Sequence, residues 1–290
     1  MNYTIRQFRK DFPNDDACLS YIFKLRYPDL AGKWYKVKGR KCYVNYKGIQ
    51  IHPLSNTILH KSETLLTDWF FAIYLIASAK NGVSAKELQR HLGCTYKTAW
   101  RIGSKIRSLM EQGTDPLTGV IEADETYIGG VRKGGHATKE KTPVLGIVKR
   151  GGGVRSKVSP DGAYTGAILK HLTDNVAFGS HIISDDNPIY RKVKRYGMFH
   201  DSVNHSKKEY VRGNIHTNTI EGFWGQMKRS IDGTYHAVSK KHLQSYVDEF
   251  AYRYSHRHSE LPLFLMMLNA VVGKPDSEAQ RSVPLLVPVA

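Results

Sequence analysis

The chain has 290 residues, a formal net charge of +17 and a pI of about 9.7. This excess of cations suits a polyanionic partner, most simply nucleic acid, although a merely basic globular protein is the plainer alternative. The three cysteines, Cys18, Cys42 and Cys94, form no CxxC pair, which excludes a disulfide framework and leaves no evident zinc site. The longest apolar stretch, 69–77, is about half a membrane span, and no secretory signal pattern is present. We therefore expect no membrane association and a reducing, cytoplasmic location.

Residues 1–60 form a small basic module, with 11 Lys and Arg against 4 Asp and Glu. A helix is expected around 17–23, followed by short strands at 34–37, 41–46 and 49–51 with glycines at the bends. The charge of this module indicates that it also contacts the polyanion.

Residues 61–112 predict helices that resemble a helix-turn-helix. A strongly apolar helix at 65–79 comes first. Ser84, with Glu87 three residues on, caps a second helix, Gly93 makes the turn, and Thr95 caps a third. The cations of that third helix are its predicted DNA contacts: Lys97, Arg101, Lys105 and Arg107. An ordinary helical hairpin is the alternative.

After a turn-rich boundary at 113–118, residues 119–258 alternate strands and helices. Strands are expected at 119–129, 143–150, 154–159 and 180–185, with a helix at 165–176 between the third and the fourth. A short basic helix from Pro188 to Arg195 and helices at 217–231 and 239–255 follow. This is the order of an α/β, ribonuclease-H-like domain with a mixed sheet flanked by helices. A C-terminal helix and tail make up 259–290.

Three acidic residues of this region carry the chemistry. Asp124 lies in an apolar strand run, where a carboxylate is costly to bury without a partner. Asp185 ends the apolar run 181–184, and Glu221 lies in the helical segment 218–224. Two strand-borne aspartates followed by a helix-borne glutamate form the acidic triad of ribonuclease-H-like polynucleotidyl transferases. Such a triad would bind two Mg²⁺ or Mn²⁺ ions, since hard divalent cations prefer carboxylate oxygens. Taken singly, each residue could instead be a strand-end, helix-capping or surface residue.

Several neighbours of the triad are candidates for supporting roles. Lys228 shares a helix face with Glu221 and could reach DNA phosphate, and Arg229 follows it. Trp224 could pack the helix or stack on a base. His205 and His216 could contact phosphate or position water, or be ordinary loop histidines. Asn218, one turn before Glu221, is the alternative third metal ligand.

The chain resembles the DDE-type transposases of bacterial insertion sequences related to the eukaryotic Merlin elements, with an ISXO2-like transposase domain. The matching segments are 82–107, 121–130, 183–190, 204–213 and 216–254. The resemblance implies a ribonuclease-H-like catalytic domain, Mg²⁺ or Mn²⁺, and cut-and-paste joining of element ends to target DNA. By motif position it implies Asp124, Asp185 and Glu221 as the triad, with asparagine in the third place of some members.

Members of this group often carry an N-terminal zinc ribbon with two CxxC pairs, and the corresponding region here retains only Cys42. A structural zinc ion is therefore not expected. The hairpin would be held without metal by Trp34, Tyr35, Tyr43 and Tyr46.

Three functions are compared on these residues. A DNA transposase, nucleoid-associated in a bacterium and at least dimeric on double-stranded DNA to hold two element ends, accounts for all of them. A non-catalytic DNA-binding protein derived from a transposase would need only the helix-turn-helix and the charge. A nuclease for RNA–DNA hybrids is disfavoured, because a recognition helix reads the B-form major groove.

Overall fold

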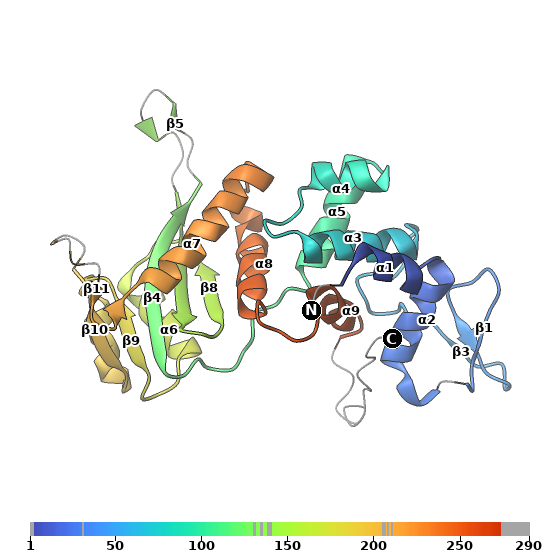
Figure 1. Ribbon diagram of the computed structural model, residues 1–290, viewed down its shortest axis with the longest axis horizontal. Helices are drawn as coiled ribbons and strands as arrows, with labels where there is room; N and C mark the ends of the chain where they lie inside the picture. The colour runs from blue at the N-terminus through green and yellow to red at the C-terminus, as the bar shows by residue number, and fades with distance from the viewer. Residues whose placement is uncertain are drawn as a thin grey trace. The chain divides into compact units, whose positions relative to one another are not determined.

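The structure is a computed structural model that describes residues 3–30, 32–129, 132–133, 136–137, 141–204, 207, 209 and 211–273. The chain divides into two compact units (Figure 1): residues 1–109 with 259–290, and residues 110–258. The first unit contains both the part predicted as a basic module and the part predicted as a helix-turn-helix. Within the described residues, no helix is long and apolar enough to cross a membrane.

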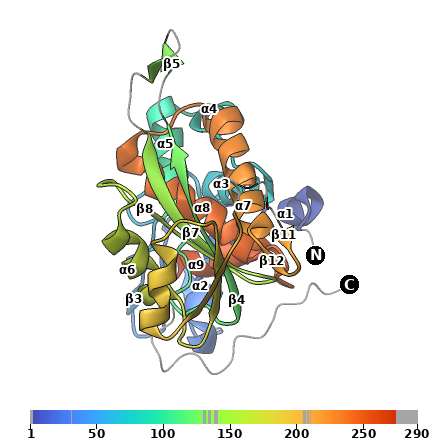
Figure 2. The same cartoon turned by 90° about the vertical axis from the view of Figure 1, so that its left-hand side faces the viewer.

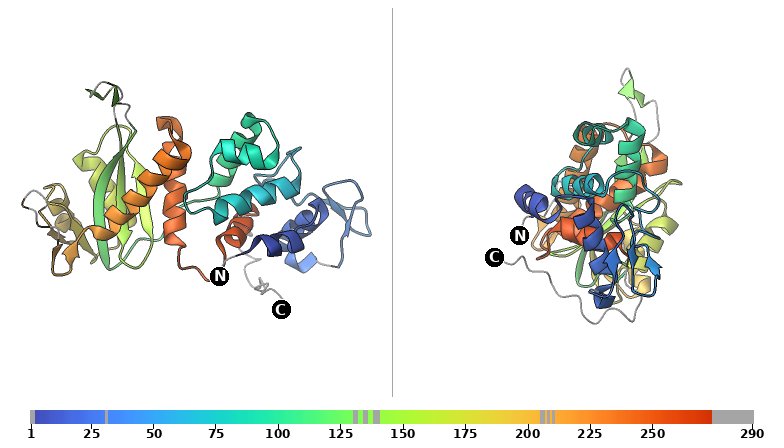
Figure 3. Two further views of the ribbon diagram at one scale, coloured as in Figure 1. Left: turned by 45° about the horizontal axis from the view of Figure 1, so that its top comes forward. Right: turned by 90° about the vertical axis from the view of Figure 1, so that its right-hand side faces the viewer.

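The first unit is mainly helical (Figure 3). Its elements are α1 (Ile5–Asp11), α2 (Asp15–Arg26), η1 (Pro28–Leu30), β1 (Tyr35–Lys36), β2 (Tyr43–Val44), β3 (Gln50–Ile51), α3 (Leu66–Ser78), α4 (Ala85–Leu92), α5 (Tyr96–Arg107) and α9 (Leu263–Val271).

Its helices are joined by a cap and an aromatic cluster. The carboxylate of Asp15 accepts hydrogen bonds from the backbone N–H groups of Leu66 and Thr67, both at 3.0 Å, and so caps α3. Phe12 packs against Phe70 and Phe264, with ring centroids 4.8 and 5.9 Å away. Residues far apart in the sequence therefore share one core.

One buried aromatic pair packs on the small antiparallel sheet β1-β2-β3. Tyr43 is buried and stacks on Phe23 with ring centroids 4.0 Å apart. Tyr35 and Tyr46 are 64% and 82% exposed, so the expectation that they hold the hairpin is wrong. For Tyr35 the reason is strand alternation, since it lies opposite Val44 and not Tyr43, whereas Tyr46 lies in the turn after β2. Whether zinc binds here stays a prediction.

Helices α4 and α5 form the predicted pair. Ser84 and Thr95 accept from the N–H groups of Glu87 and Thr98, and Gly93 ends α4 in the left-handed region. Lys97 and Arg101 are exposed on α5. This geometry does not show whether α5 reads DNA.

Two of the four predicted cations of α5 are turned inward. Arg107 is only 3% exposed, because it continues the buried row of Ala99 and Gly103 at intervals of four residues along the helix. The Nζ of Lys105 donates to the carbonyl oxygen of Ile58 at 3.0 Å. Arg107 as placed does not present its guanidinium to DNA, which corrects the prediction for it.

The second unit is a five-stranded mixed sheet with helices on both faces. Its main elements are β4 (Val120–Ile128), β7 (Thr142–Lys149), β8 (Val154–Val158), α6 (Thr165–Asn175), β9 (His181–Ser184), η2 (Tyr190–Tyr196), β10 (Phe199–Ser202), α7 (Asn218–Ser230), η4 (Ile231–Tyr235), η5 (Lys240–His242) and α8 (Leu243–Ser255). The short pairs β5 (Arg132–Lys133) with β6 (His136–Ala137) and β11 (Val211–Arg212) with β12 (Ile215–His216) complete it.

The strand order is β10-β9-β4-β7-β8, with β7 and β8 antiparallel to their neighbours and β9 and β10 parallel to theirs. This arrangement is compatible with a ribonuclease-H-like fold. The four predicted strands and the helices between and after them are confirmed to within a few residues. The fifth strand, β10, was not predicted, because its sequence FHDS has no sustained apolar alternation.

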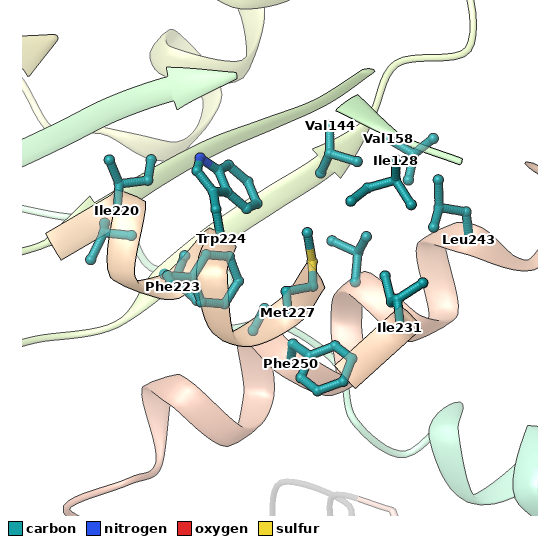
Figure 4. Close-up of a cluster of buried hydrophobic side chains, with 14 residues drawn as sticks. Ile128, Val144, Val158, Ile220, Phe223, Trp224, Met227, Ile231, Leu243 and Phe250 are labelled. Carbon is teal, nitrogen blue, oxygen red and sulfur yellow. The ribbon is translucent and has the colours of Figure 1, made fainter. Parts of the chain in front are cut away.

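Period-two alternation divides the sheet into two cores. One face carries Val144, Val148 and Ile128 against Ile220, Phe223 and Met227 of α7 and against α8 (Figure 4). The other carries Ile121, Ala123, Leu145 and Ile147 against α6 and η2. Figure 2 shows α6 on one side of the strands and α7 on the other. A residue of β4 therefore faces α7 or α6 according to its parity.

Candidate active site

Asp124 lies on the α7 face of the central strand β4. Its backbone partner on β7 is Gly146, and Trp224 of α7 covers that position. The indole Nε1 of Trp224 donates to Oδ2 of Asp124 at 3.1 Å, and Figure 4 shows this nitrogen turned toward the sheet. A Cβ on Gly146 would lie 2.3 Å from Cζ2 of Trp224, so only glycine lets the indole reach the carboxylate.

The carboxyl group of Asp124 is electrostatically strained. Burial, followed by the negative charges of Glu125 and Asp185, raises its pKa to about 7, against the opposing hydrogen bonds from the Glu125 backbone and Trp224. A half-buried carboxylate with carboxylates beside it is the setting in which a cation would be favoured.

Asp185 follows directly on β9, as predicted. β9 runs parallel to β4 with Ile183 opposite Glu122, so continuing this register by two residues places Asp185 beside Asp124. Its Oδ1 accepts from the backbone N–H of Asn187 at 3.1 Å. The alternative that Asp185 caps the following helix is not what the structure has: η2 begins after Ile189 with no side-chain cap, and the Asp185 carboxylate stabilises the turn that precedes it.

Glu125 follows Asp124 on β4 and therefore faces α6 and η2, where it was expected to be no more than a solvated neighbour. It accepts from Nδ2 of Asn187 at 3.0 Å and from the hydroxyl of Tyr190 at 2.5 Å. Burial raises its pKa, as does the charge of Asp185. These partners lie more than sixty residues away in the chain, so no local pattern could have shown them.

Glu221 lies in the first turn of α7 and is exposed. Thr217 Oγ1 donates to its Oε1 at 2.7 Å. It precedes Trp224 by three residues and so lies one turn away on the same flank of the helix. Asn218, the first residue of α7, is also exposed.

The structure thus brings Asp124 and Asp185 together and leaves Glu221 at the rim. Within the described ranges, no three His, Cys, Asp or Glu side chains converge as a ready metal site. The donor chemistry nevertheless fits a hard divalent cation, since Asp124 and Asp185 offer carboxylate oxygens whose mutual repulsion a cation would relieve. Asp124 and Asp185 would hold such an ion, and Glu221 would have to turn inward to join them.

Glu122 positions α7 and was missed by the sequence reading. Its side chain is fully buried, and its Oε2 accepts from the backbone N–H groups of Thr219 and Ile220 at 2.7 and 3.0 Å. Nε of Arg150 donates to its Oε1 at 2.7 Å. A carboxylate at a helix N-terminus is favourable electrostatically. Because Glu122 and Asp124 are two residues apart, strand periodicity could have placed both on one face.

The remaining predicted residues are distributed as follows. His216 is 25% exposed, with its Nδ1 3.4 Å from Oε1 of Glu122, so it belongs to the anchor of α7. Trp224 is 4% exposed and buried in the core, which excludes stacking on a DNA base as placed. Lys228 and Arg229 are exposed at the end of α7. His205 lies outside the described residues.

A family model matches most of this same unit, and a curated relative matches a longer part of the chain. Residues 116–255 match the family model of the ISXO2-like transposase domain. A curated protein of Halobacterium salinarum, an uncharacterized protein in transposable element ISH50, is 25% identical over 217 residues, which cover 69% of this chain and 73% of that protein. Over these residues the chain is similar to a transposase domain and to a protein of a transposable element.

Among solved structures, the chain matches one from the cryoEM structure of a simian T-cell lymphotropic virus intasome in complex with PP2A regulatory subunit B56 gamma. The identity is 12%, the match covers 77% of this chain and 78% of that chain, and the TM-score is 0.33. A likeness at this score supports no conclusion about the chain.

Proposed function

We propose that the protein is a DDE-type DNA transposase that cleaves element ends and joins them to target DNA. The observation that carries the proposal is the nearness of Asp124, on β4, to Asp185, directly after the parallel neighbour β9, inside a segment that matches a transposase domain. The finer grouping with Merlin-related elements is part of this proposal.

The residues of the chain have separate tasks in this proposal. Trp224 holds the Asp124 carboxylate by donating to its Oδ2. Glu122 and Arg150 fix the N-terminus of α7, and with it the approach of Glu221. Bound Mg²⁺ or Mn²⁺ would supply Lewis-acid activation of the attacking oxygen and of the leaving 3′ oxygen.

DNA recognition is assigned to exposed cations of both units. Lys97 and Arg101 lie one turn apart on α5, and Lys228 and Arg229 follow the proposed catalytic face of α7. Cations of this kind neutralise phosphates and make affinity depend on salt. Since two element ends must be held together, we propose that the active form on DNA is at least a dimer.

The test uses the full chain and DNA carrying the terminal repeats that flank its gene. Wild type should bind this DNA and nick it at the 3′ end of the element when Mg²⁺ or Mn²⁺ is added. Asp124→Asn should bind equally and not nick, while Asp161→Asn, which changes an exposed loop carboxylate of the same unit, should nick as wild type. Nicking by Asp124→Asn would overturn the site.

The second candidate is a DNA-binding protein without catalysis. The absence of a converged three-ligand group among the described side chains favours it. Tight binding of the same DNA by wild type with no nicking in either metal would establish it in place of the transposase.

A further inference from the structure

A strip of cations lies on the α6 side of the sheet, the face opposite to the Asp124 side chain. Within η2, the side chains of Tyr190 and Val193 are 2% and 0% exposed. Residues three apart in a 3₁₀-helix lie above one another, so these two anchor one side of η2. Its other side carries four exposed cations, which we call the η2 strip: Arg191, Lys192, Lys194 and Arg195.

The η2 strip leads from Glu125 to the opposite end of β9. At its start, the Tyr190 hydroxyl donates to Glu125. At its end, Gly197 donates its backbone N–H to the carbonyl oxygen of Lys194, and its own carbonyl oxygen accepts from the backbone N–H of Gly179, just before β9 begins. The four residue steps from His181 to Asp185 span roughly 13 Å at about 3.3 Å per residue. That length corresponds to about four nucleotides of one strand at about 3.4 Å each.

A hollow of about 700 Å³ lies at this far end, which we call the β10 hollow. Its walls include Phe178 and Phe199, which are 85% and 67% exposed. Lys194 of the η2 strip also lines it, as does the ion pair of His181 with Asp201, whose Nε2 and Oδ2 are 2.7 Å apart. Its volume is within the ~300–1,000 Å³ of ordinary ligand pockets.

Only one face of the Phe178 ring packs against the protein, and the contact is with Gly197. A Cβ on Gly197 would lie 1.9 Å from Cε2 of Phe178, so the ring rests directly on the glycine backbone. Its other face is open to solvent, as the 85% exposure requires. A fixed, open aromatic face next to cations is the usual platform for stacking a nucleobase.

We propose that the β10 hollow binds an unpaired nucleobase of a DNA strand whose phosphates lie along the η2 strip. The proposal rests on the proposed action on DNA and adds to it a second binding site away from the reacting phosphate. Charge favours this occupant, because residues 187–200 contain four cations and no Asp or Glu. A paired base would keep its faces in the helix stack, so the base must be unpaired to use Phe178.

The test compares two labelled DNAs with the full chain by fluorescence anisotropy: a blunt duplex of the terminal repeat, and the same duplex with a short oligothymidine extension. Wild type should bind the extended DNA about tenfold more tightly than the blunt DNA. Phe178→Ala should lose this preference and Phe178→Trp should keep it. Tyr164→Ala, which removes an exposed aromatic side chain elsewhere in the unit, should leave it unchanged.

Charge is tested by a matched pair of double variants. Lys192→Ala with Lys194→Ala should weaken binding of the extended DNA and make its dependence on salt shallower. Lys157→Ala with Lys170→Ala removes the same charge from other exposed positions of the unit and should change neither the extension preference nor its salt dependence. Thermal melting of each variant confirms that it is folded.

Three results would overturn the inference. An equal extension preference in Phe178→Ala and wild type would remove the stacking role. Full competition by free thymidine monophosphate would make the ligand a free nucleotide rather than a strand. A change of oligomeric state in Phe178→Ala without DNA, with the preference intact, would assign the hollow to protein contact. Nicking of blunt DNA by wild type, measured in parallel, separates these failures from failure of the proposed function.

Discussion

Asp124 combines features that a structural carboxylate rarely has together. It lies in the central strand, it is largely removed from solvent, and its nearest charges are negative. A folded protein normally avoids this combination because the ionised form is disfavoured. Residues that break this rule without a structural partner are candidates for function.

The raised pKa gives Asp124 a pH signature in the metal-free protein. Because its pKa is 3.8 in the unfolded chain and about 7 in the fold, the folded state binds the extra proton between these values. Its contribution to stability is therefore largest below about pH 4 and is lost as pH rises to about 7. Compared with Asp124→Asn, wild type should lose at most about 4 kcal/mol of unfolding free energy over this range.

Urea denaturation of both proteins at several pH values, with a chelator present, measures this difference. Above pH 7, added Mn²⁺ should raise the melting temperature of wild type and not that of Asp124→Asn. Parallel pH profiles for the two proteins would mean that Asp124 is not held as described.

The contact of Trp224 with Gly146 is a second residue-scale test. Gly146→Ala should destabilise the unit by about 1–3 kcal/mol, because the new methyl group overlaps the indole. Gly222→Ala is the matched control on α7, where a Cβ meets nothing within 4 Å, and it should be neutral or slightly stabilising. Thermal melting distinguishes them, and equal effects would show that the indole does not lie over Gly146.

At the scale of elements, α7 depends on a carboxylate from another strand. Glu122→Gln should cost about 3 kcal/mol of stability, since it breaks a buried ion pair with Arg150. Glu111→Gln, at an exposed position of the same unit, should cost little. Nicking by the refolded Glu122→Gln protein should also fall, because the N-terminus of α7 carries Glu221. Unchanged stability would mean that Glu122 does not anchor the helix.

Helix α5 gives a prediction that separates its two kinds of cation. Arg101→Ala should weaken DNA binding and reduce the salt slope by about one, with little change in melting temperature. Arg107→Ala should instead lower stability, because its side chain is buried. Arg9→Ala, exposed on α1, is the control for charge. Equal losses of affinity for Arg101→Ala and Arg107→Ala without destabilisation would refute this assignment.

The errors at Arg107 of α5 and at Tyr35 of β1 have one cause, because the periodicity of the element was left out at both residues. The third helix and its Thr95 cap could be predicted from local signals, because capping and apolar spacing act over a few residues. Counting its cations without their helical phase wrongly placed Arg107 on the surface. At Tyr35 the missed information was strand parity, which turns its side chain to the face opposite to Tyr43, and Tyr46 lies in a turn outside the strands.

For the whole molecule, the order of strands and helices in the second unit followed from periodicity and turn residues. The position of Asp185 at a strand end followed from the same patterns. What could not be predicted is held by contacts between distant residues: Glu125 with Tyr190, Asp15 with α3, and the pairing of β10 with β9. Such contacts leave no periodic trace in a single sequence.

The measurement that tests the central claim most directly is metal-dependent 3′ nicking of the terminal DNA by wild type, Glu221→Gln and Asn218→Ala. We predict that wild type nicks, that Glu221→Gln is slower by about 100-fold or more, and that Asn218→Ala stays close to wild type. Loss of nicking only in Asn218→Ala would move the third ligand one turn along α7. A Glu221→Gln protein that nicks at the wild-type rate, or a wild type that binds this DNA and never nicks it, would contradict the account.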